Sequence, residues 1–493
     1  MAVEADRPQD ALTQLDDRVP TAFYWKLTLL ATLGGFLFGY DTANIGSVLN
    51  FVPYQMDAFV TGYLVAGASI GAAVGAFAAG FLTDRFGRKS LLIADAGIYA
   101  AGAILSAVTW HLAVLLIART LIGLAVGADS AIATAYIAEY APKSRRGALS
   151  ILQQWMITVG ILVSYLVALI IFLIWPGSAF GADWRVILGL GAIPAIAGLI
   201  LRTRMPESPR WLIHRGRLDD ARKAFRMVGM DATTEDVQAS ADRLEKDERE
   251  RAHRSLWTPG VKRALLVVAV FMVFQQITGI NVPFYYGPKI MSPFFGGSGS
   301  DELHAAITGV EVTTIMAAVN VIATYFAFKF IDRIGRRRLA MGGFALMAVF
   351  MLLGAAGDGW LAGVAQIVVV MIALDLFIVA FAVGVGGTGW LIQGEVFPTA
   401  VRGRAAALGA TADWVANFLL VQFFPAWQDA IGLPWVMVCF AVLAVLAVAF
   451  VAGYLPETKG LSVEHVTRIF ARDAERGMLA PTRGEQQPEV NRR

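Results

Sequence analysis

The sequence predicts an all-α membrane protein built from two related six-helix halves. Hydrophobic residues make up 57% of the 493 residues and charged residues only 16%, and the mean hydropathy is +0.60. A soluble chain of this length needs more charge to cover its surface. Three motifs also recur in the same order in the second half of the chain, which indicates duplication of one module. A duplicated membrane bundle is typical of a transporter.

Twelve apolar stretches are long enough to cross a bilayer, for which about 20 apolar residues are needed. They begin near Tyr24, Asp57, Ser90, His111, Ala148, Trp184, Val261, Ala305, Leu339, Leu361, Val401 and Leu433. An even number of spans places both ends of the chain on the same side of the membrane. The short loops rich in Arg and Lys lie on that side too, so the positive-inside rule predicts cytoplasmic termini. We therefore expect a multi-pass protein of the inner (plasma) membrane.

The spans divide the chain around a polar central segment. Residues 24–201 are predicted to form the first six-helix half and residues 261–456 the second. Between them, residues 202–260 are predicted to form an exposed linker, in which the charged run at 241–249 suits a helix. Residues 1–23 are read as a cytosolic tail, and residues 457–493 as a cytosolic segment that becomes disordered after about Arg472.

Two of the repeated motifs place charged residues at the cytoplasmic ends of the spans. The first is a turn whose glycine allows a tight reversal, and the second supplies glutamates that the arginines of the turn can reach. The third is a Pro-Glu-Ser/Thr sequence at residues 206–208 and 456–458. We interpret the charged residues as a cytoplasmic gate that opens with the bundle, the alternative being arginines that only set topology. They are Asp84, Arg85, Arg88, Glu139 and Arg146, and in the second half Asp332, Arg333, Arg336, Glu395 and Arg402.

Asp41 in span 1 and Arg119 in span 4 are ionisable residues within the predicted spans. Charges inside a bilayer are costly and usually functional. A carboxyl group that alternates between a protonated state and an ionised, arginine-paired state can carry a proton. We interpret Asp41 and Arg119 as a proton-coupling pair, and a permanent structural ion pair is the alternative.

Span 7 carries amide and phenol side chains, which suit an uncharged ligand rich in hydroxyl groups because an amide both donates and accepts. These residues are Gln275, Gln276, Asn281, Tyr285 and Tyr286. Other spans add Gln154, Asn320 and Asn417, together with Trp390 and Trp414, whose flat faces suit a sugar ring. Gly279 and Pro283 weaken the helix of span 7, as a gating helix requires. The alternative is that the amides hold helices together.

These residues together resemble the sugar porter family of the major facilitator superfamily over roughly residues 24–465. The motifs that carry the resemblance are Gly39-Tyr40-Asp41, both Asp-Arg-x-Gly-Arg turns, Pro206-Glu207-Ser208-Pro209-Arg210-Trp211-Leu212, Gln275-Gln276-x-x-Gly279-Ile280-Asn281 and Pro456-Glu457-Thr458-Lys459-Gly460. The resemblance implies twelve helices, an intracellular helical domain and alternating access. It also implies proton coupling by Asp41 and Arg119. Sugar-contacting positions of the family match Gln154, Gln275, Gln276, Asn281, Asn320, Trp390 and Asn417.

The sequence departs from the family pattern at several positions. Span 4 has Thr134 where the family has proline, and residues 384–389 before Trp390 have glycines where the family has prolines. Asp413 stands where the family usually has an amide, and it shares a helix face with the substrate-binding candidate Asn417. Its carboxylate can accept from sugar hydroxyls, and pairing with a cationic substrate or carrying a second proton are the alternatives. Asp129 and Asp375 are further acids within spans, for which a structural and a functional role are equally open.

A proton-coupled importer of a monosaccharide or polyol is the first hypothesis. A uniporter of the same fold, a sensor that signals through its tails, and a transporter of a cationic metabolite are the alternatives. An enzyme is not expected, because the sequence has no nucleotide-binding loop, metal-ligand cluster or nucleophile–base set. We expect the protein to act as a monomer in the lipid bilayer, with a sugar or polyol and a proton as ligands and without cofactor, metal or nucleic acid.

Overall fold

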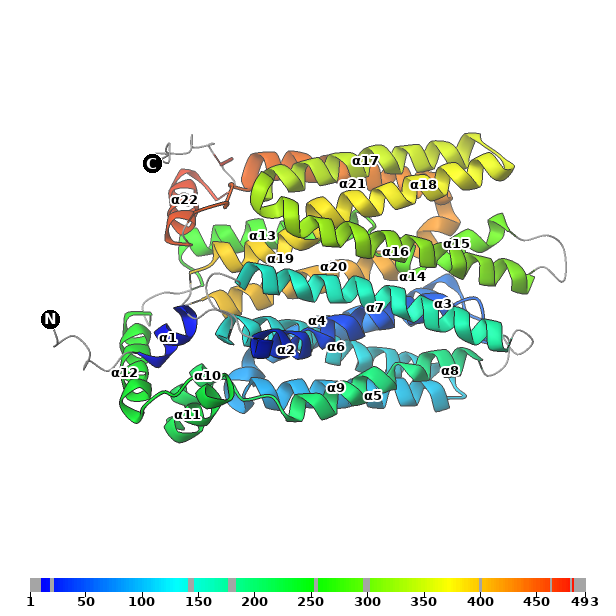
Figure 1. Cartoon of the computed structure of the whole chain (residues 1–493). Helices are drawn as coiled ribbons and strands as arrows, with labels where there is room; N and C mark the ends of the chain where they lie inside the picture. Colours follow the sequence, from blue (N-terminus) through cyan, green and yellow to red (C-terminus); the bar gives the residue numbers. More distant parts are fainter. Residues whose placement is uncertain are drawn as a thin grey trace.

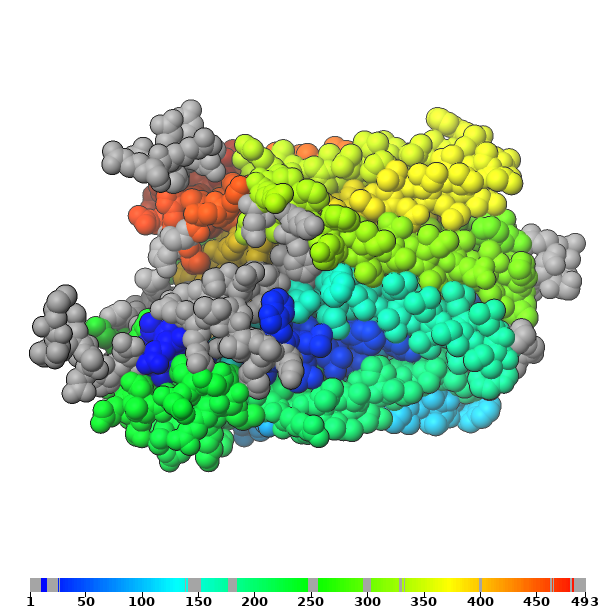
Figure 2. Space-filling model, in the orientation of Figure 1, coloured from blue at the N-terminus to red at the C-terminus, as the bar shows by residue number. Residues whose placement is uncertain are grey.

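The computed structural model describes residues 10–17, 22–140, 146–175, 183–251, 256–295, 302–398, 401–461, 463–478 and 481–482. These residues contain helices and no β-strand. Long helices run side by side, with the first half of the chain in one body and the second half in another (Figure 1). The boundary between the two bodies runs along the helices in the space-filling view (Figure 2). Eleven of the described helices are long and apolar enough to cross a membrane.

The helices of the first half pack closely through small residues. Gly71 on α4 (Ala58–Phe86) lies against the Thr120 carbonyl on α6 (Leu112–Tyr140), and Gly127 on α6 lies against Ala72 on α4. Glycines at such spacings let two helix backbones approach each other inside a membrane. The elements of this half are α2 (Ala22–Ala31), α3 (Leu33–Val48), α4 (Ala58–Phe86), α5 (Arg88–Val108), α6 (Leu112–Tyr140), α7 (Arg146–Ile174), α8 (Asp183–Leu190) and α9 (Ala192–Thr203).

The first predicted span is divided in the structure. A turn at Thr32 separates α2 from α3, and the Thr32 hydroxyl donates to the Leu29 carbonyl at 3.1 Å. A threonine that bonds back to its own helix is a common cause of such a bend. Because α3 alone has 16 residues, this span is the one missing from the eleven long helices.

The second half has the same plan, with two local breaks. The elements are α13 (Pro259–Ile277), α14 (Val282–Tyr285), α15 (Gly287–Met291), η2 (Ser292–Phe294), α16 (Glu302–Ile334), α17 (Arg336–Trp360), α18 (Gly363–Phe381), η3 (Ala382–Gly386), α19 (Gly387–Val396), α20 (Arg402–Ile431) and α21 (Leu433–Tyr454). The break predicted in span 7 is present, since α13 ends at Ile277 and Gly279 has a φ of 94°. The glycine-rich part of span 10 forms η3, a π-helix, which widens the turn.

Short amphipathic helices gather at one end of the bundle, which we call the helical-domain end (Figure 1). They are α1 (Ala11–Asp17), α10 (Pro209–His214), α11 (Leu218–Met227), α12 (Thr234–Arg251) and α22 (Val463–Arg476). The helix expected at 241–249 is part of α12.

Two of these helices were not predicted. Within the expected N-terminal tail, α1 packs on α12, and Asp10 accepts a hydrogen bond from Ser240 at 2.5 Å and pairs with Arg243. At the other end of the chain, α22 packs on α13 and continues to Arg476, four residues beyond the point at which disorder was expected. Both helices have partners that are far away in the sequence, which is why local composition did not reveal them.

Candidate substrate cavity and proton site

A polar cavity of about 70 Å³ lies between the two halves. The first half contributes Phe38, Thr42, Gln154, Ile157, Thr158 and Ile161, from α3 and α7. The second half contributes Gln275, Gln276, Ile280, Asn281, Phe284, Asn320, Thr324, Phe381, Ala382, Gly386, Trp390, Asp413, Trp414 and Asn417. The cavity therefore brings together all of the predicted substrate-binding residues except Tyr285 and Tyr286.

A chain of hydrogen bonds orders the amides along one wall of the cavity. Asn281 donates to Gln276 at 2.8 Å, and Gln276 in turn donates to Asp413 at 2.8 Å. Asp413 is 3% exposed. Gln276 donates its N–H group to Asp413, so Asp413 is the acceptor on which the chain ends. Nearby, Asn417 donates across the boundary between the halves to Ser69 at 3.3 Å.

The helix breaks position the remaining polar groups. The carbonyl of Gly386, at the end of η3, accepts a hydrogen bond from Gln275 at 3.1 Å. An intact α-helix would use that carbonyl within its own ladder, whereas a π-turn leaves the local bonding irregular. Asn281 lies in the interruption between α13 and α14, where the ring of Phe440 fills the space beside Gly279. The breaks at Gly279 and in the glycine-rich part of span 10 thus position the side chains of Asn281 and Gln275 in the cavity wall.

The structure places Tyr285 and Tyr286 outside the cavity lining. Both are buried, with exposed fractions of 1%. The Tyr286 hydroxyl donates to the Val421 carbonyl at 2.8 Å, and its ring stacks on Phe424. In this conformation neither tyrosine lines the cavity, and Tyr286 points toward α20 instead; their contact with substrate stays a prediction.

Asp41 and Arg119 form a direct ion pair in the interior of the first half. Arg119 is 0% exposed and Asp41 2% exposed, and Arg119 also donates to the Leu64 carbonyl at 3.2 Å. The next residue after Asp41 is Thr42, which lines the cavity. A change in the charge of Asp41 would therefore act on the helix that forms part of the cavity wall.

Each repeated turn makes an arginine–glutamate pair at the helical-domain end. Arg88 lies 2.9 Å from Glu139 and 3.8 Å from Asp84, and Arg336 lies 2.7 Å from Glu395. Each of these two pairs joins helices of the same half.

The other predicted gate residues have different surroundings. Arg85 and Arg333 are exposed, with Arg85 over the ring of Phe86. Arg402 donates to the Phe397 carbonyl at 3.1 Å. The side chains of Arg146 and Asp332 lie outside the described residues.

Two glutamates of the third repeated motif complete these clusters, although they are not among the predicted gate residues. Glu207 accepts from the backbone N–H groups of Arg88 and Lys89 at 2.9 and 3.2 Å. Glu457 accepts from those of Arg336 and Arg337 at 2.9 and 3.2 Å. The repeat of Pro-Glu-Ser/Thr was the signal that pointed to them.

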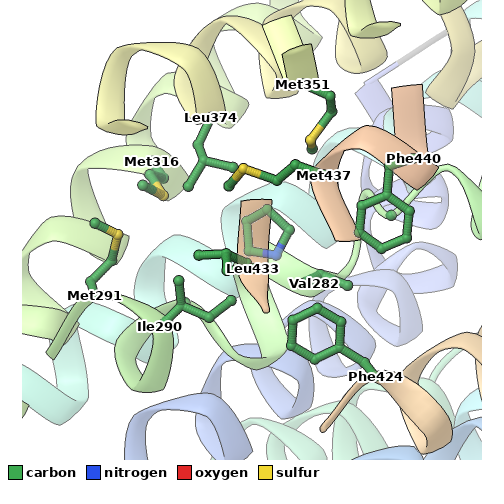
Figure 3. Close-up of a pocket in the computed structure, with 13 residues that line it drawn as sticks. Val282, Ile290, Met291, Met316, Met351, Leu374, Phe424, Leu433, Met437 and Phe440 are labelled. Carbon is green, nitrogen blue, oxygen red and sulfur yellow. The ribbon is translucent and has the colours of Figure 1, made fainter. Parts of the chain in front are cut away.

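A second, smaller cavity of about 20 Å³ lies between the short helices α14 and α15 and the neighbouring helices of the second half. Apolar side chains line it (Figure 3). Four methionines, Met291, Met316, Met351 and Met437, belong to its wall. The wall exposes no polar surface, so this cavity offers nothing that would recognise a hydroxyl-rich ligand. The polar cavity is therefore the candidate substrate site.

Comparison with known proteins agrees with this geometry. Residues 27–470 match the family described as sugar (and other) transporter. The chain is 32% identical to the arabinose-proton symporter of Bacillus subtilis, with 93% of this chain and 99% of the relative covered. It is 35% identical to a glucose transporter of Staphylococcus epidermidis, with 90% of this chain and 96% of the relative covered.

Solved structures give the same result at the level of the fold. The partially occluded inward-open xylose transporter XylE of E. coli superposes with a TM-score of 0.76 at 28% identity, covering 90% of this chain and all of that one. The same transporter, described as a proton:xylose symporter of the major facilitator superfamily, superposes with a TM-score of 0.75 when bound to 6-bromo-6-deoxy-D-glucose. The chain belongs to the sugar transporter family of the major facilitator superfamily.

Proposed function

We propose that this protein imports a monosaccharide or polyol together with a proton, by alternating access of the cavity between its two halves. The observation that carries the proposal is the position of the buried Asp41–Arg119 pair, one residue away from the cavity wall at Thr42. The names of the arabinose-proton and xylose-proton relatives support the same reaction.

Protonation of Asp41 is the step that couples the two ligands. A neutral carboxyl loses most of its attraction to Arg119, which keeps its hydrogen bond to the Leu64 carbonyl on α4. Helix α3 is then free to move relative to α6, and the outward-open state becomes accessible. Substrate binding between the halves drives closure, and loss of the proton on the inner side restores the ion pair.

The cavity residues take complementary roles toward the substrate. The amides of Gln154, Gln275 and Asn320 donate to and accept from sugar hydroxyls, and the chain Asn281–Gln276–Asp413 ends in an acceptor. Trp390 and Trp414 offer their faces to the C–H surface of the ring. The arginine–glutamate clusters at the helical-domain end act as the inner gate.

The same proposal includes the topology and the domain division. Residues 24–201 and 261–456 are the two moving halves, and residues 202–260 form the intracellular helical domain together with the segments at the chain ends. With the helical-domain end in the cytoplasm, the basic loops lie inside, and the protein works as a monomer in the inner (plasma) membrane.

Replacement of Asp41 tests the coupling. Asp41→Asn removes the titratable group but keeps a polar side chain of similar size, so pH-driven accumulation of substrate in liposomes should be lost while exchange of substrate across the membrane persists. Asp219→Asn, at an exposed acid on α11, is the control and should accumulate substrate normally. An Asp41→Asn protein that still concentrates substrate against its gradient would rule out this mechanism.

A transporter of a cationic metabolite is the second candidate, because Asp413 places a carboxylate in the cavity wall. A carboxylate is an acceptor for hydroxyl groups and equally a partner for an ammonium group. Competition assays distinguish the two functions, since amines would block uptake in the second case and sugars or polyols in the first.

A further inference from the structure

A second buried ionic cluster lies in the first half, apart from Asp41 and Arg119. Arg202, in the last turn of α9, lies 2.8 Å from Asp95 on α5 and 2.5 Å from Asp129 on α6. The three residues are 0%, 3% and 3% exposed. Arg202 also donates to the carbonyls of Leu92 and Leu30, at 2.8 and 3.4 Å.

The charges of this cluster do not balance if both carboxyl groups are ionised. One guanidinium then faces two carboxylates, which leaves one negative charge in a buried, membrane-spanning region. Among the described residues, the ion pairs of Asp95 and of Asp129 are both with Arg202, and no second cation pairs with either carboxyl group. An uncompensated buried charge is strongly unfavourable, and such a site takes up a proton or a counter-ion instead.

The position of both carboxyl groups around one guanidinium indicates that the site takes up a proton. Both carboxyl groups approach the same guanidinium, and among the described residues Asp95 Oδ2 and both oxygens of Asp129 have no hydrogen-bond partner apart from the ion pair of Asp129 Oδ2 with Arg202. Two ionised carboxylates have only acceptors and repel each other, whereas a protonated carboxyl donates to its neighbour. A metal cation would need several more oxygen ligands, and the carbonyls of Leu30 and Leu92 are already bonded to Arg202.

We propose that Asp95 and Asp129 bind one proton between them, beside Arg202, and form a second proton site distinct from Asp41–Arg119. The two sites are joined by the same pair of helices. On α6, Arg119 and Asp129 are separated by a rise of about 15 Å. On α3, Asp41 and Gly34 are two helical turns apart, and Gly34 packs so closely on Asp129 that a methyl group there would overlap the carboxyl group.

This arrangement links the second site to the conformation of the first. If α3 shifts against α6 when Asp41 is protonated, the backbone at Gly34 moves away from Asp129. The shared proton then exchanges more easily, on the side of the bundle that faces the helical-domain end. This consequence rests on the proposed function, whereas the proton site itself does not.

Infrared spectroscopy of the purified, substrate-free protein tests the proton site directly. A protonated carboxyl group has a carbonyl stretch well separated from that of a carboxylate and shifted by deuterium exchange. The wild-type spectrum minus that of Asp95→Asn should contain this band at neutral pH, and so should the difference for Asp129→Asn. Asp473→Asn is the matched control, because Asp473 is a buried acid near two arginines, Arg263 and Arg476, and its difference spectrum should show only a carboxylate.

Each single variant keeps one carboxylate as the partner of Arg202 and should fold. The double variant, Asp95→Asn with Asp129→Asn, leaves Arg202 without an acidic partner and should unfold at a clearly lower temperature. The difference spectra of both single variants are recorded from mildly acidic to mildly alkaline pH. The proposal fails if, at every pH, both spectra contain only the band of a carboxylate and no band of a protonated carboxyl group. Because the measurement involves neither transport nor Asp41, it can fail while the Asp41→Asn experiment succeeds, and the converse also holds.

Discussion

Asp413 distinguishes this cavity from one built only of amides and aromatic rings. It lies on the same face of α20 as Asn417, as the four-residue spacing predicted, and both line the cavity. The amide of Gln276 donates to it, which fixes the carboxylate as the end of the hydrogen-bond chain. For an uncharged sugar, the side chain of Asp413 is a hydrogen-bonding partner held in a fixed position.

We predict that Asp413→Asn weakens sugar binding without abolishing proton coupling. An ordinary hydrogen bond contributes about 0.5–1.5 kcal/mol, so the dissociation constant should rise by roughly 2- to 10-fold. Isothermal titration with the preferred sugar measures this change. Asp375→Asn, at a half-buried acid of α18 outside the cavity lining, is the control. Unchanged sugar affinity combined with loss of inhibition by amines would instead favour the cationic substrate.

At the scale of elements, the two halves use the same clamp at the start of corresponding helices. Gly87 and Gly335 have φ values of 91° and 102°, and the carboxylates of Glu207 and Glu457 occupy the space where a side chain would otherwise lie. Each carboxylate therefore approaches the free N–H groups at the N-terminus of α5 or α17. A negative charge there is favourable because it faces the positive end of the helix dipole.

We predict that Glu207→Ala and Glu457→Ala destabilise the protein to a similar degree. Each loses several hydrogen bonds to an ionised acceptor, and we expect a decrease of about 1–3 kcal/mol for each variant. Thermal unfolding of the purified protein measures it. Glu235→Ala, at an exposed glutamate in the first turn of α12, should have little effect. If only one of the two motif variants is less stable, the clamps are not equivalent.

At the scale of the whole molecule, the halves meet at the end opposite the helical domain. The Tyr165 hydroxyl on α7 donates to the Phe284 carbonyl at 2.6 Å, and Asn50 donates to the Pro288 carbonyl at 3.5 Å. Gly46 on α3 allows this approach, since a side chain there would meet the backbone of α14. The flexible methionines around the small apolar cavity provide room in which α14 and α15 can repack.

We predict that Gly46→Val prevents this closure and traps the protein open at that end. Uptake should fall strongly, and a cysteine at Asn50, in a Cys439→Ser background, should react faster with a membrane-impermeant thiol reagent. Gly359→Val, at an exposed position near the end of α17, is the matched control and should leave both readouts unchanged. Equal thiol reactivity with and without Gly46→Val would show that the contact at Gly46 does not control access.

The sequence by itself determined the features that arise from local pattern. Apolar length and duplicated motifs were sufficient for the membrane bundle and its two halves, and Gly279 and residues 384–389 marked the breaks near the cavity. Amides are rare in apolar spans, so Gln275, Gln276, Asn281 and Asn417 were visible as a group, and all of them line the cavity.

Only the tertiary structure decided which distant residues meet. Asp129 was left open between two roles because its partners, Asp95 and Arg202, lie on other helices. The direction of Tyr286 depends on how α14 packs against α20, and α1 gains its stability from α12. Side-chain direction and ion pairing are set by contacts between elements, and neither composition nor periodicity within one span contains that information.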